Sequence, residues 1–268
     1  MRTFGLIGYP LGHSFSQKYF TEKFERENIS DATFQNFPLQ NINDFPSLVQ
    51  SKLSLSGLSV TIPYKQKVMA FLDKRDVLAT SIGAVNCIKI SRNEDGKVKT
   101  VGFNTDAYGF EQSLRPLIKP HHDGALILGT GGAALAIKFV LAKIGFKHYF
   151  VSRNNIKTDF MPAHLKISGF DIPVFEDKVI GYADINEEIL NEYNIIVNST
   201  PAGMFPDENS CPAIPYELLT EKHLLYDLIY NPEETLFLKN GKEQGAQVKN
   251  GLEMLQLQAE KAWEIWND

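Results

Sequence analysis

Polar side chains that could bind or transform a small molecule occur in four short segments of the first 106 residues. The segments are "GHSFS", "SVTIPYK", "GAVN" and "GFNTD", and each adjoins an apolar stretch with strand character. Ligands of α/β proteins bind at the ends of the sheet strands. Hydroxyls and amides with one cation and one anion suit a small polyhydroxylated acid better than an apolar cofactor or a metal. The candidate residues are Ser14, Ser16, Thr61, Lys65, Asn86 and Asp106.

Each candidate also has a purely structural explanation. Ser14 or Ser16 could cap the following helix, and Asp106 could be an N-cap. Asn86 could complete a turn, and Lys65 could be a solvated surface residue. The six together favour a ligand site over six unrelated structural roles.

A glycine-rich turn in the middle of the chain points to a nucleotide. "LILGTGGAALA" places Gly129, Gly131 and Ala134 at GxGxxA spacing, between an apolar strand and a helix. The first glycine permits a tight turn and the second lets backbone amides approach a pyrophosphate. The small third residue lets helix and strand pack closely, and the helix N-terminus favours the anion. The motif therefore predicts dinucleotide binding.

The residues after the next strand bear on the choice of cofactor. NAD usually meets a carboxylate there, whereas the 2′-phosphate of NADP requires cations. This chain has Ser152, Arg153 and Lys157, and arginine can bind a phosphate with two parallel hydrogen bonds. The sequence favours NADP.

The elements that must position these groups alternate between strand and helix, which predicts an α/β protein with a mainly parallel sheet in its first part. Strands are expected at 4–8, 33–39 and 57–62, with a hairpin at 84–91 and 98–105, and helices at 16–28, 42–53 and 65–74. The pattern restarts near residue 107, which predicts a second α/β domain. Its expected strands lie within 124–128, 147–154, 193–200 and 223–231, and its helices within 132–145 and 233–245; a C-terminal helical segment covers 250–268.

The composition excludes several classes of protein. The chain has 268 residues, 43% of them hydrophobic and 22% charged, with a net charge of -5. That charge argues against a nucleic-acid-binding surface. The two cysteines, Cys87 and Cys211, form no metal-binding or disulfide pattern, and no stretch is long and apolar enough for a membrane span. We expect a cytoplasmic protein without a metal site.

The quoted motifs resemble those of the shikimate dehydrogenase family. "VTIPYK" followed by "GAVN" and "NTD" is specific to it, and the likeness continues through "VSRN", "VNSTPAGM", "YDLIYNPEET" and "NGLEMLQLQA". The resemblance implies an NADP-dependent oxidoreductase that reversibly reduces 3-dehydroshikimate to shikimate, in the biosynthesis of chorismate and aromatic amino acids. It also implies a substrate domain at 1–106, completed by helices at 246–268 that return to it, and a Rossmann-like NADP-binding domain at 107–245.

The resemblance implies a role for each matched residue. Lys65 and Asp106 would flank the reacting carbon. Ser14 and Ser16, with Tyr230, would bind the substrate carboxylate, and Thr61, Asn86 and Gln258 the ring hydroxyls. The expected cofactor-binding residues are Gly129, Thr130, Gly131, Gly132, Ala133, Ala134, Ser152, Arg153, Lys157, Thr200, Leu228 and Gly251.

Two positions depart from the family pattern, and two other functions stay open. The family usually has asparagine where this chain has Ser59 and Ser152.

One alternative function is that of a quinate/shikimate dehydrogenase that uses NAD, and another is that of a non-catalytic NADP-binding sensor. The expected partners are small molecules, without nucleic acid or membrane, and the expected state is a monomer or homodimer.

Overall fold

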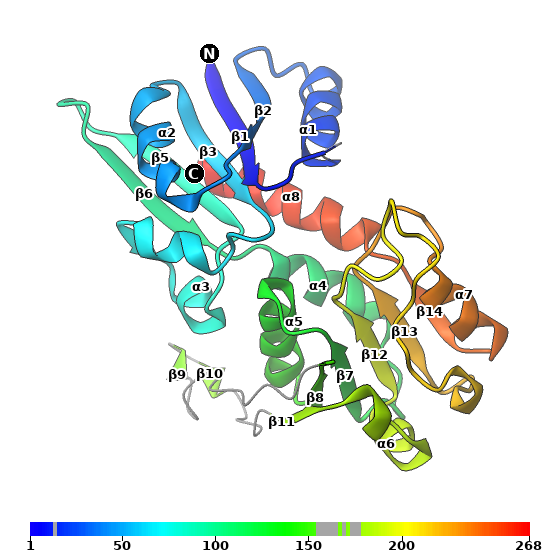
Figure 1. Ribbon diagram of the computed structural model, residues 1–268. Coiled ribbons are helices and arrows are strands. Elements are labelled where there is room, and N and C mark those ends of the chain that lie inside the picture. Colours follow the sequence, from blue (N-terminus) through cyan, green and yellow to red (C-terminus); the bar gives the residue numbers. More distant parts are fainter. Residues whose placement is uncertain (13–14, 154–165, 168–169, 172–177) are drawn as a thin grey trace. The chain divides into compact units, whose positions relative to one another are not determined.

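The computed structural model describes residues 1–12, 15–153, 166–167, 170–171 and 178–268. The chain forms two compact units. Unit 1 comprises Met1–Thr105 with Gln258–Asp268, and unit 2 comprises Asp106–Leu257. Each unit contains one six-stranded sheet with helices around it (Figure 1). The predicted two-domain α/β fold is confirmed.

The sheet of unit 1 has the strand order β2-β1-β3-β5-β6-β4. β1 is parallel to β2 and β3, and β4 is parallel to β6. β5 is antiparallel to both of its neighbours. The strands are β1 (Arg2–Gly8), β2 (Ala32–Pro38), β3 (Leu55–Val60), β4 (Lys74–Arg75), β5 (Cys87–Arg92) and β6 (Val98–Phe103).

The helices of unit 1 differ from the expectation at two places. In place of the helix expected at 65–74, the structure has only a five-residue 3-10 helix, η2, which follows the turn around Pro63. The sequence pattern also missed α3, which Asp76 caps by accepting a hydrogen bond from the Ala79 amide at 2.7 Å. The helices are α1 (Phe15–Arg26), η1 (Ile42–Asp44), α2 (Phe45–Ser51), η2 (Lys67–Phe71) and α3 (Val77–Ile82).

Unit 2 has a fully parallel sheet with the strand order β11-β8-β7-β12-β13-β14. Counted along the chain, this is the 3-2-1-4-5-6 order of dinucleotide-binding folds. Its strands are β7 (Gly124–Leu128), β8 (Lys147–Val151), β11 (Lys178–Ile180), β12 (Ile195–Asn198), β13 (Leu224–Asp227) and β14 (Gln247–Lys249). A separate antiparallel pair consists of β9 (Lys166–Ile167) and β10 (Phe170–Asp171).

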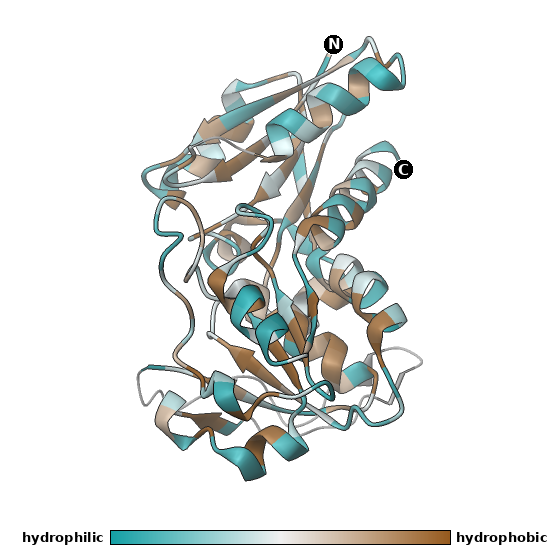
Figure 2. Cartoon of the chain, turned by 90° about the vertical axis from the view of Figure 1, so that its right-hand side faces the viewer, coloured by the Kyte–Doolittle hydropathy of each residue, from teal (hydrophilic) through white to brown (hydrophobic). Residues whose placement is uncertain are grey.

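In unit 2, α4 and η3 precede the first strand, and α5, α6 and α7 each lie between two strands, as expected for β-α-β units. The helices of this unit are α4 (Asp106–Leu114), η3 (Arg115–Leu117), α5 (Gly132–Lys143), η4 (Tyr182–Asp184), α6 (Glu187–Glu192), η5 (Tyr216–Leu218) and α7 (Leu236–Glu243). The C-terminal helix α8 (Leu252–Asn267) begins in unit 2, and its residues from Gln258 onward belong to unit 1. Figure 2 shows hydrophobic strands and helices that alternate between hydrophobic and hydrophilic residues, the pattern of sheets covered by amphipathic helices.

The end of α8 is anchored to the sheet of unit 1 by Trp266. This indole is 5% exposed, stacks on Phe4 with ring centroids 5.0 Å apart, and donates its Nε1–H to the Ile88 carbonyl oxygen at 3.0 Å. Gly57 leaves room for it, since a Cβ at that position would lie 2.5 Å from the indole. The close approach explains a glycine in the middle of β3.

We expect Trp266→Ala to destabilise the protein by about 3–5 kcal/mol, because it removes a large buried ring and leaves a cavity. Denaturant unfolding of the variant measures the loss. Trp266→Phe is the matched control: it keeps an aromatic ring against Phe4 and loses only the donor, so its cost should be clearly smaller. Equal stability of the wild type and the alanine variant would show that α8 is not anchored by this residue.

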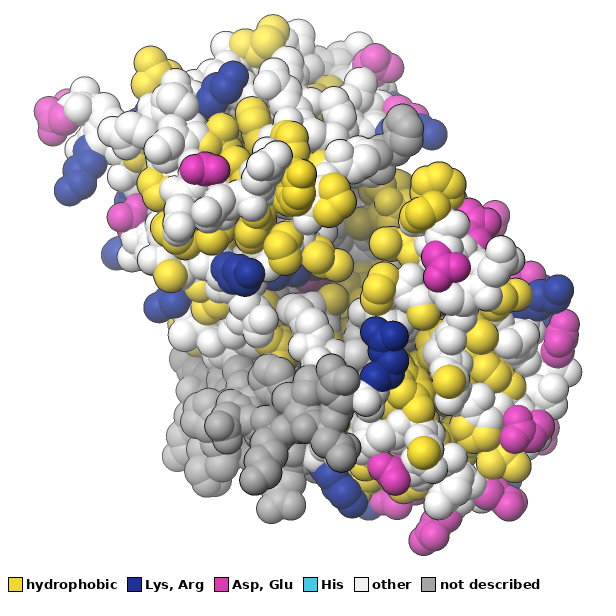
Figure 3. Space-filling view, viewed as in Figure 1, with side chains coloured by type: hydrophobic (Ala, Val, Ile, Leu, Met, Phe, Trp, Pro, Cys, Tyr) yellow, Lys and Arg dark blue, Asp and Glu magenta, His cyan; other side chains and the backbone are white. Residues whose placement is uncertain are grey.

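The surface shows no concentration of positive charge on the face drawn in Figure 3. Lys and Arg side chains of the described residues are scattered there among hydrophobic and acidic ones. None of the helices in the described part of the chain combines the length and apolar character that a membrane span requires.

Candidate active site

One edge of the unit 1 sheet brings together the loops that contain the predicted polar residues. Ser59 of β3 pairs with Cys87 of β5, and Cys87 pairs with Phe103 of β6. Because β5 is antiparallel to both strands, its amino end lies beside their carboxyl ends. Thr61 and Asn86 therefore come to the same edge from segments far apart in the sequence.

A hydrogen-bonded group of three polar side chains lies at this edge. The Asn86 amide donates to Thr105 Oγ1 at 2.9 Å and to Gln258 Oε1 at 2.8 Å. Asn86 Oδ1 in turn accepts from the Thr105 backbone amide at 2.6 Å. The structure thus brings two predicted residues, Asn86 and Gln258, into contact, although 172 positions separate them. Sequence reasoning did not single out Thr105, although "GFNTD" had drawn attention to its neighbour.

The backbone around Lys65 is fixed at the same edge. The Tyr64 amide donates to the Thr61 carbonyl oxygen at 2.9 Å, which closes a turn around Pro63. Tyr64 is buried, and its hydroxyl donates to the Leu39 carbonyl oxygen at 2.6 Å. The Lys65 carbonyl oxygen accepts from the Val85 amide at 2.7 Å, and its side chain is half-buried. The strand β3 ends at Val60, and the turn around Pro63 then places the Lys65 backbone next to the segment that contains Asn86.

Asp106 and Ser16 each lie in the first turn of a helix. Asp106 is the first residue of α4 in unit 2, follows Thr105 directly in the chain, and is 4% exposed. Ser16 is half-buried and is the second residue of α1. Neither residue is an N-cap, so the capping alternative does not apply to them. Ser14 lies outside the described residues, and the pairing of Asp106 with Lys65 stays a prediction.

Unit 2 contains the expected glycine turn after β7. Gly129 has φ +102, a left-handed conformation that glycine adopts without strain, and its amide donates to the Val151 carbonyl oxygen at 2.9 Å. A Cβ at Gly129 would lie 2.9 Å from Ser199 Oγ, whereas a Cβ at Gly131 would meet no atom within 4 Å. Ala134 is fully buried against the sheet. This open, glycine-lined start of α5 fits a dinucleotide pyrophosphate.

The segment after β8 presents one described cation. The Ser152 amide donates to the Ile180 carbonyl oxygen at 3.0 Å, and Arg153 follows with an exposed side chain. Its charge lies near Tyr182, where it lowers the pKa of the phenol against the larger, opposite effect of burial. Lys157 lies outside the described residues. Arg153 is available to an anionic group of a ligand.

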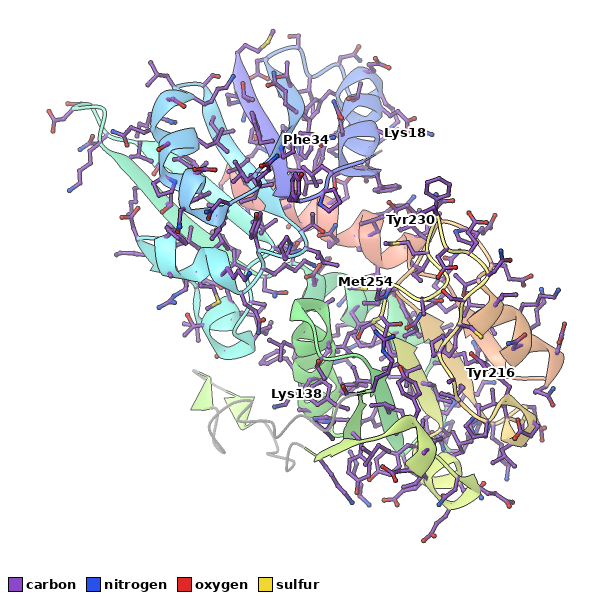
Figure 4. The ribbon with its side chains drawn as sticks, in the orientation of Figure 1. Lys18, Phe34, Lys138, Tyr216, Tyr230 and Met254 are labelled. Carbon is purple, nitrogen blue, oxygen red and sulfur yellow. The ribbon has the colours of Figure 1, made fainter. Side chains whose placement is uncertain are left out.

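The segments after β12, β13 and β14 contain the remaining predicted residues of unit 2. Thr200 and Leu228 are half-buried, and so is Tyr230, where burial raises the pKa of the phenol. Figure 4 labels Tyr230 on the loop after β13. Gly251 approaches this loop so closely that a Cβ would lie 2.1 Å from the Leu228 carbonyl oxygen. The glycine at 251 is therefore required by the packing within unit 2.

No group of three or more His, Cys, Asp and Glu side chains among the described residues is arranged to hold a metal ion.

Comparisons with known proteins give the family. Residues 6–88 match the family model described as the shikimate dehydrogenase substrate binding domain. A shikimate dehydrogenase (NADP(+)) from Methanococcus vannielii is 37% identical over 265 residues, which covers 98% of this chain and 90% of the relative.

Solved structures agree with these matches. Shikimate dehydrogenase 1 from Peptoclostridium difficile has a TM-score of 0.83 and 32% identity, with 100% of this chain and 92% of that chain covered. The enzyme from Thermus thermophilus, solved with NADP(H) and shikimate, has a TM-score of 0.79 and 28% identity, with 99% and 93% covered. The similarity extends over both units, confirms the resemblance inferred from the motifs, and shows that the chain belongs to the shikimate dehydrogenase family.

Proposed function

We propose that this chain is an NADP-dependent shikimate dehydrogenase, which reversibly reduces 3-dehydroshikimate to shikimate in the biosynthesis of chorismate and aromatic amino acids. The observation that supports this most directly is the polar edge of unit 1, where Asn86, Thr105 and Gln258 are hydrogen-bonded to one another and Lys65 follows the turn around Pro63. Amide and hydroxyl groups of this kind can bind the hydroxyls of a polyhydroxylated ring, and a lysine can supply the proton of a carbonyl reduction.

The substrate is held by residues of both units in this proposal. Ser14 and Ser16, with Tyr230, bind the carboxylate. Thr61, Asn86 and Gln258 bind the ring hydroxyls. The contacts of Asn86 with Thr105 and Gln258 fix its amide before any ligand arrives, which lowers the entropy that binding must overcome.

Lys65 and Asp106 act on the reacting oxygen. NADPH, when bound, supplies the hydride that reduces the carbonyl carbon. The Lys65 ammonium donates a proton to the carbonyl oxygen as that oxygen gains negative charge, and it takes the proton back in the oxidation of shikimate. Asp106 accepts a hydrogen bond from the ammonium and keeps it directed at the oxygen.

Binding of the cofactor uses the glycine turn and four further segments of unit 2. The pyrophosphate lies at the start of α5, and Ser152, Arg153 and Lys157 bind the 2′-phosphate. Thr200, Leu228 and Gly251 line the nicotinamide side. The pyrophosphate contacts are made by the turn itself: Gly129, Thr130, Gly131, Gly132, Ala133 and Ala134.

The cell compartment and assembly belong to the same proposal. We propose a cytoplasmic enzyme, monomeric or homodimeric, that takes small molecules and neither nucleic acid nor membrane as its partners.

The test is an assay of NADP reduction by the purified protein with shikimate. Parallel assays replace shikimate with quinate, and NADP with NAD. We expect the largest kcat/KM for shikimate with NADP. A larger value for quinate with NAD would support the paralogue, and binding of NADP without turnover of either substrate would support the sensor.

We expect Arg153→Ala to weaken NADP binding by about tenfold to a hundredfold and NAD binding much less. A charge-assisted bond to a phosphate is worth roughly 1.5–3 kcal/mol, and only NADP has the 2′-phosphate. Titration of both cofactors with each protein measures the difference. Lys147→Ala is the matched control, because it removes an exposed cation from the amino end of the same strand, β8. Equal losses for NADP and NAD would show that Arg153 does not recognise the phosphate.

A further inference from the structure

Two neighbouring strands of unit 2 end in buried polar residues that the sequence analysis did not single out. β12 is "IIVN" and β13 is "LLYD", so each apolar strand finishes with a polar side chain. Asn198 and Asp227 are pairing partners in the parallel sheet and both are fully buried. Asn198 Nδ2 donates to Asp227 Oδ1 at 3.0 Å. Burying a carboxyl group is costly unless its hydrogen bonds are satisfied, so this pair requires an explanation.

The Asp227 carboxylate accepts three hydrogen bonds from three parts of the chain. Besides Asn198, the Ile229 amide donates to Oδ1 at 3.0 Å, and Thr235 Oγ1 donates to Oδ2 at 2.6 Å. Burial raises the pKa of Asp227 to about 6, against the lowering effect of these donors. All three partners donate to the carboxyl oxygens, and an ionised carboxylate can accept all three bonds at once.

Through Asn198 the carboxylate orders the loop after β12. Asn198 Oδ1 accepts from the Thr200 backbone amide at 3.0 Å and from Thr200 Oγ1 at 2.6 Å. These contacts form a turn in which the asparagine side chain replaces a backbone partner. The Asn198 amide, held by Asp227, thus sets the position of Thr200.

The other two hydrogen bonds that the carboxylate accepts order the loop after β13. The bond to the Ile229 amide fixes the residue between Leu228 and Tyr230. The bond to Thr235 fixes the far end of the loop, where Thr235 also caps α7 by accepting from the Leu238 amide at 3.4 Å. One side chain therefore closes this loop at both ends.

We propose that Asp227 is a positioning residue that joins these two loops, and so sets the places of Thr200, Leu228 and Tyr230 relative to one another. The inference rests on the proposed function, in which these residues line the nicotinamide side and bind the substrate carboxylate. Asp227 itself touches neither ligand. Its role is to hold the nicotinamide side in one arrangement. Two backbone bonds also link the segments, from the Leu228 amide to the Asn198 carbonyl oxygen at 3.0 Å and from the Phe205 amide to the Asn231 carbonyl oxygen at 3.5 Å, but neither fixes Thr200.

Loss of this link should disturb the binding of only one half of the cofactor, the nicotinamide half. The nicotinamide ring depends on the two loops, whereas the adenosine half depends on the glycine turn and Arg153. 2′-Phospho-ADP-ribose lacks the nicotinamide ring and is therefore a probe of the adenosine half alone. A general loss of folding would weaken both ligands equally.

The experiment compares variants that lose these hydrogen bonds with variants that can keep them. Asp227→Ala removes every bond, whereas Asp227→Asn retains an acceptor oxygen for Asn198 and Ile229, and the Thr235 hydroxyl can turn to accept from its new amide. Thr235→Val removes the donor, and Thr235→Ser keeps it. Tyr226→Phe is the control, because it removes a buried 2.6 Å hydrogen bond to Ser113 from the residue next to Asp227 without touching either loop.

We expect Asp227→Ala and Thr235→Val to lower kcat/KM for NADP by about tenfold or more, since a displacement of about 1 Å can cost that much in rate. Part of the loss should be in kcat, while the dissociation constant of 2′-phospho-ADP-ribose stays near that of the wild type. Asp227→Asn, Thr235→Ser and Tyr226→Phe should retain near-normal kinetics. Thermal unfolding of each variant identifies an assay temperature at which all the variants are folded.

Wild-type kinetics in a folded Asp227→Ala variant would overturn the inference, and so would equal losses of NADP and 2′-phospho-ADP-ribose. If Asp227→Ala does not fold, the Thr235→Val and Thr235→Ser pair decides in the same way. A wild-type protein inactive on shikimate would instead refute the proposed function. The comparison of NADP with its fragment would then still test the link between the loops.

Discussion

Replacing Lys65 by alanine is expected to lower the turnover of shikimate oxidation by about a hundredfold or more, in the range of positioned general acid–base groups. The dissociation constant for shikimate should change only a few-fold. The charge on the reacting oxygen develops mainly in the transition state, so a donor directed at it contributes more to turnover than to binding. Steady-state kinetics and direct titration of shikimate separate the two effects.

Lys67→Ala provides the control for this experiment. Lys67 lies two residues further along the same segment, begins η2 and is exposed, so its loss changes the charge of the region but not the proposed donor. Near-normal turnover of Lys65→Ala, with only shikimate binding weakened, would show that Lys65 anchors the substrate and does not transfer the proton.

The fold could be predicted where apolar segments are long and regularly spaced. The strand at 124–128 is buried at every residue and is followed by a glycine turn, so its pattern permits only one interpretation. The six residues of α3 are too few to show a helical period, and the N-cap Asp76 was hidden in the charged segment "FLDKRD". The three-residue strand β14 is half-buried throughout and has no distinct pattern. Such short elements depend on their neighbours for stability, and a local pattern does not contain that information.

The polar groups of the site could be predicted only in part, for a related reason. Asn86 and Gln258 were inferred from motifs, but their contact depends on how α8 meets the sheet of unit 1. Thr105 joins this group through its backbone amide as well as its hydroxyl, and no residue type predicts a backbone donor. Asn198 and Asp227 did leave a signal, namely a polar residue at the end of each of two apolar strands. That they order the loops after β12 and β13 could be inferred only from the strand register, which places Asn198 beside Asp227.

Replacing Asp106 by asparagine should also lower turnover by about a hundredfold, because in the proposed mechanism its carboxylate keeps the Lys65 ammonium directed at the reacting oxygen. Asparagine has nearly the same shape, so the first turn of α4 should persist, and thermal unfolding checks this. Asp123→Asn, which neutralises an exposed carboxylate of the same unit, should leave turnover unchanged.

The double variant Lys65→Ala/Asp106→Asn decides whether the two residues act as one unit. If Asp106 works only through the ammonium of Lys65, its replacement can cost little once that ammonium is gone, and the double variant should be nearly as active as Lys65→Ala alone. Independent contributions would instead multiply, and turnover would fall by about ten-thousandfold. Multiplicative losses would therefore refute the pairing and give Asp106 a separate role at the reacting carbon. Turnover numbers of the wild type, the two single variants and the double variant, measured under saturating shikimate and NADP, complete the cycle.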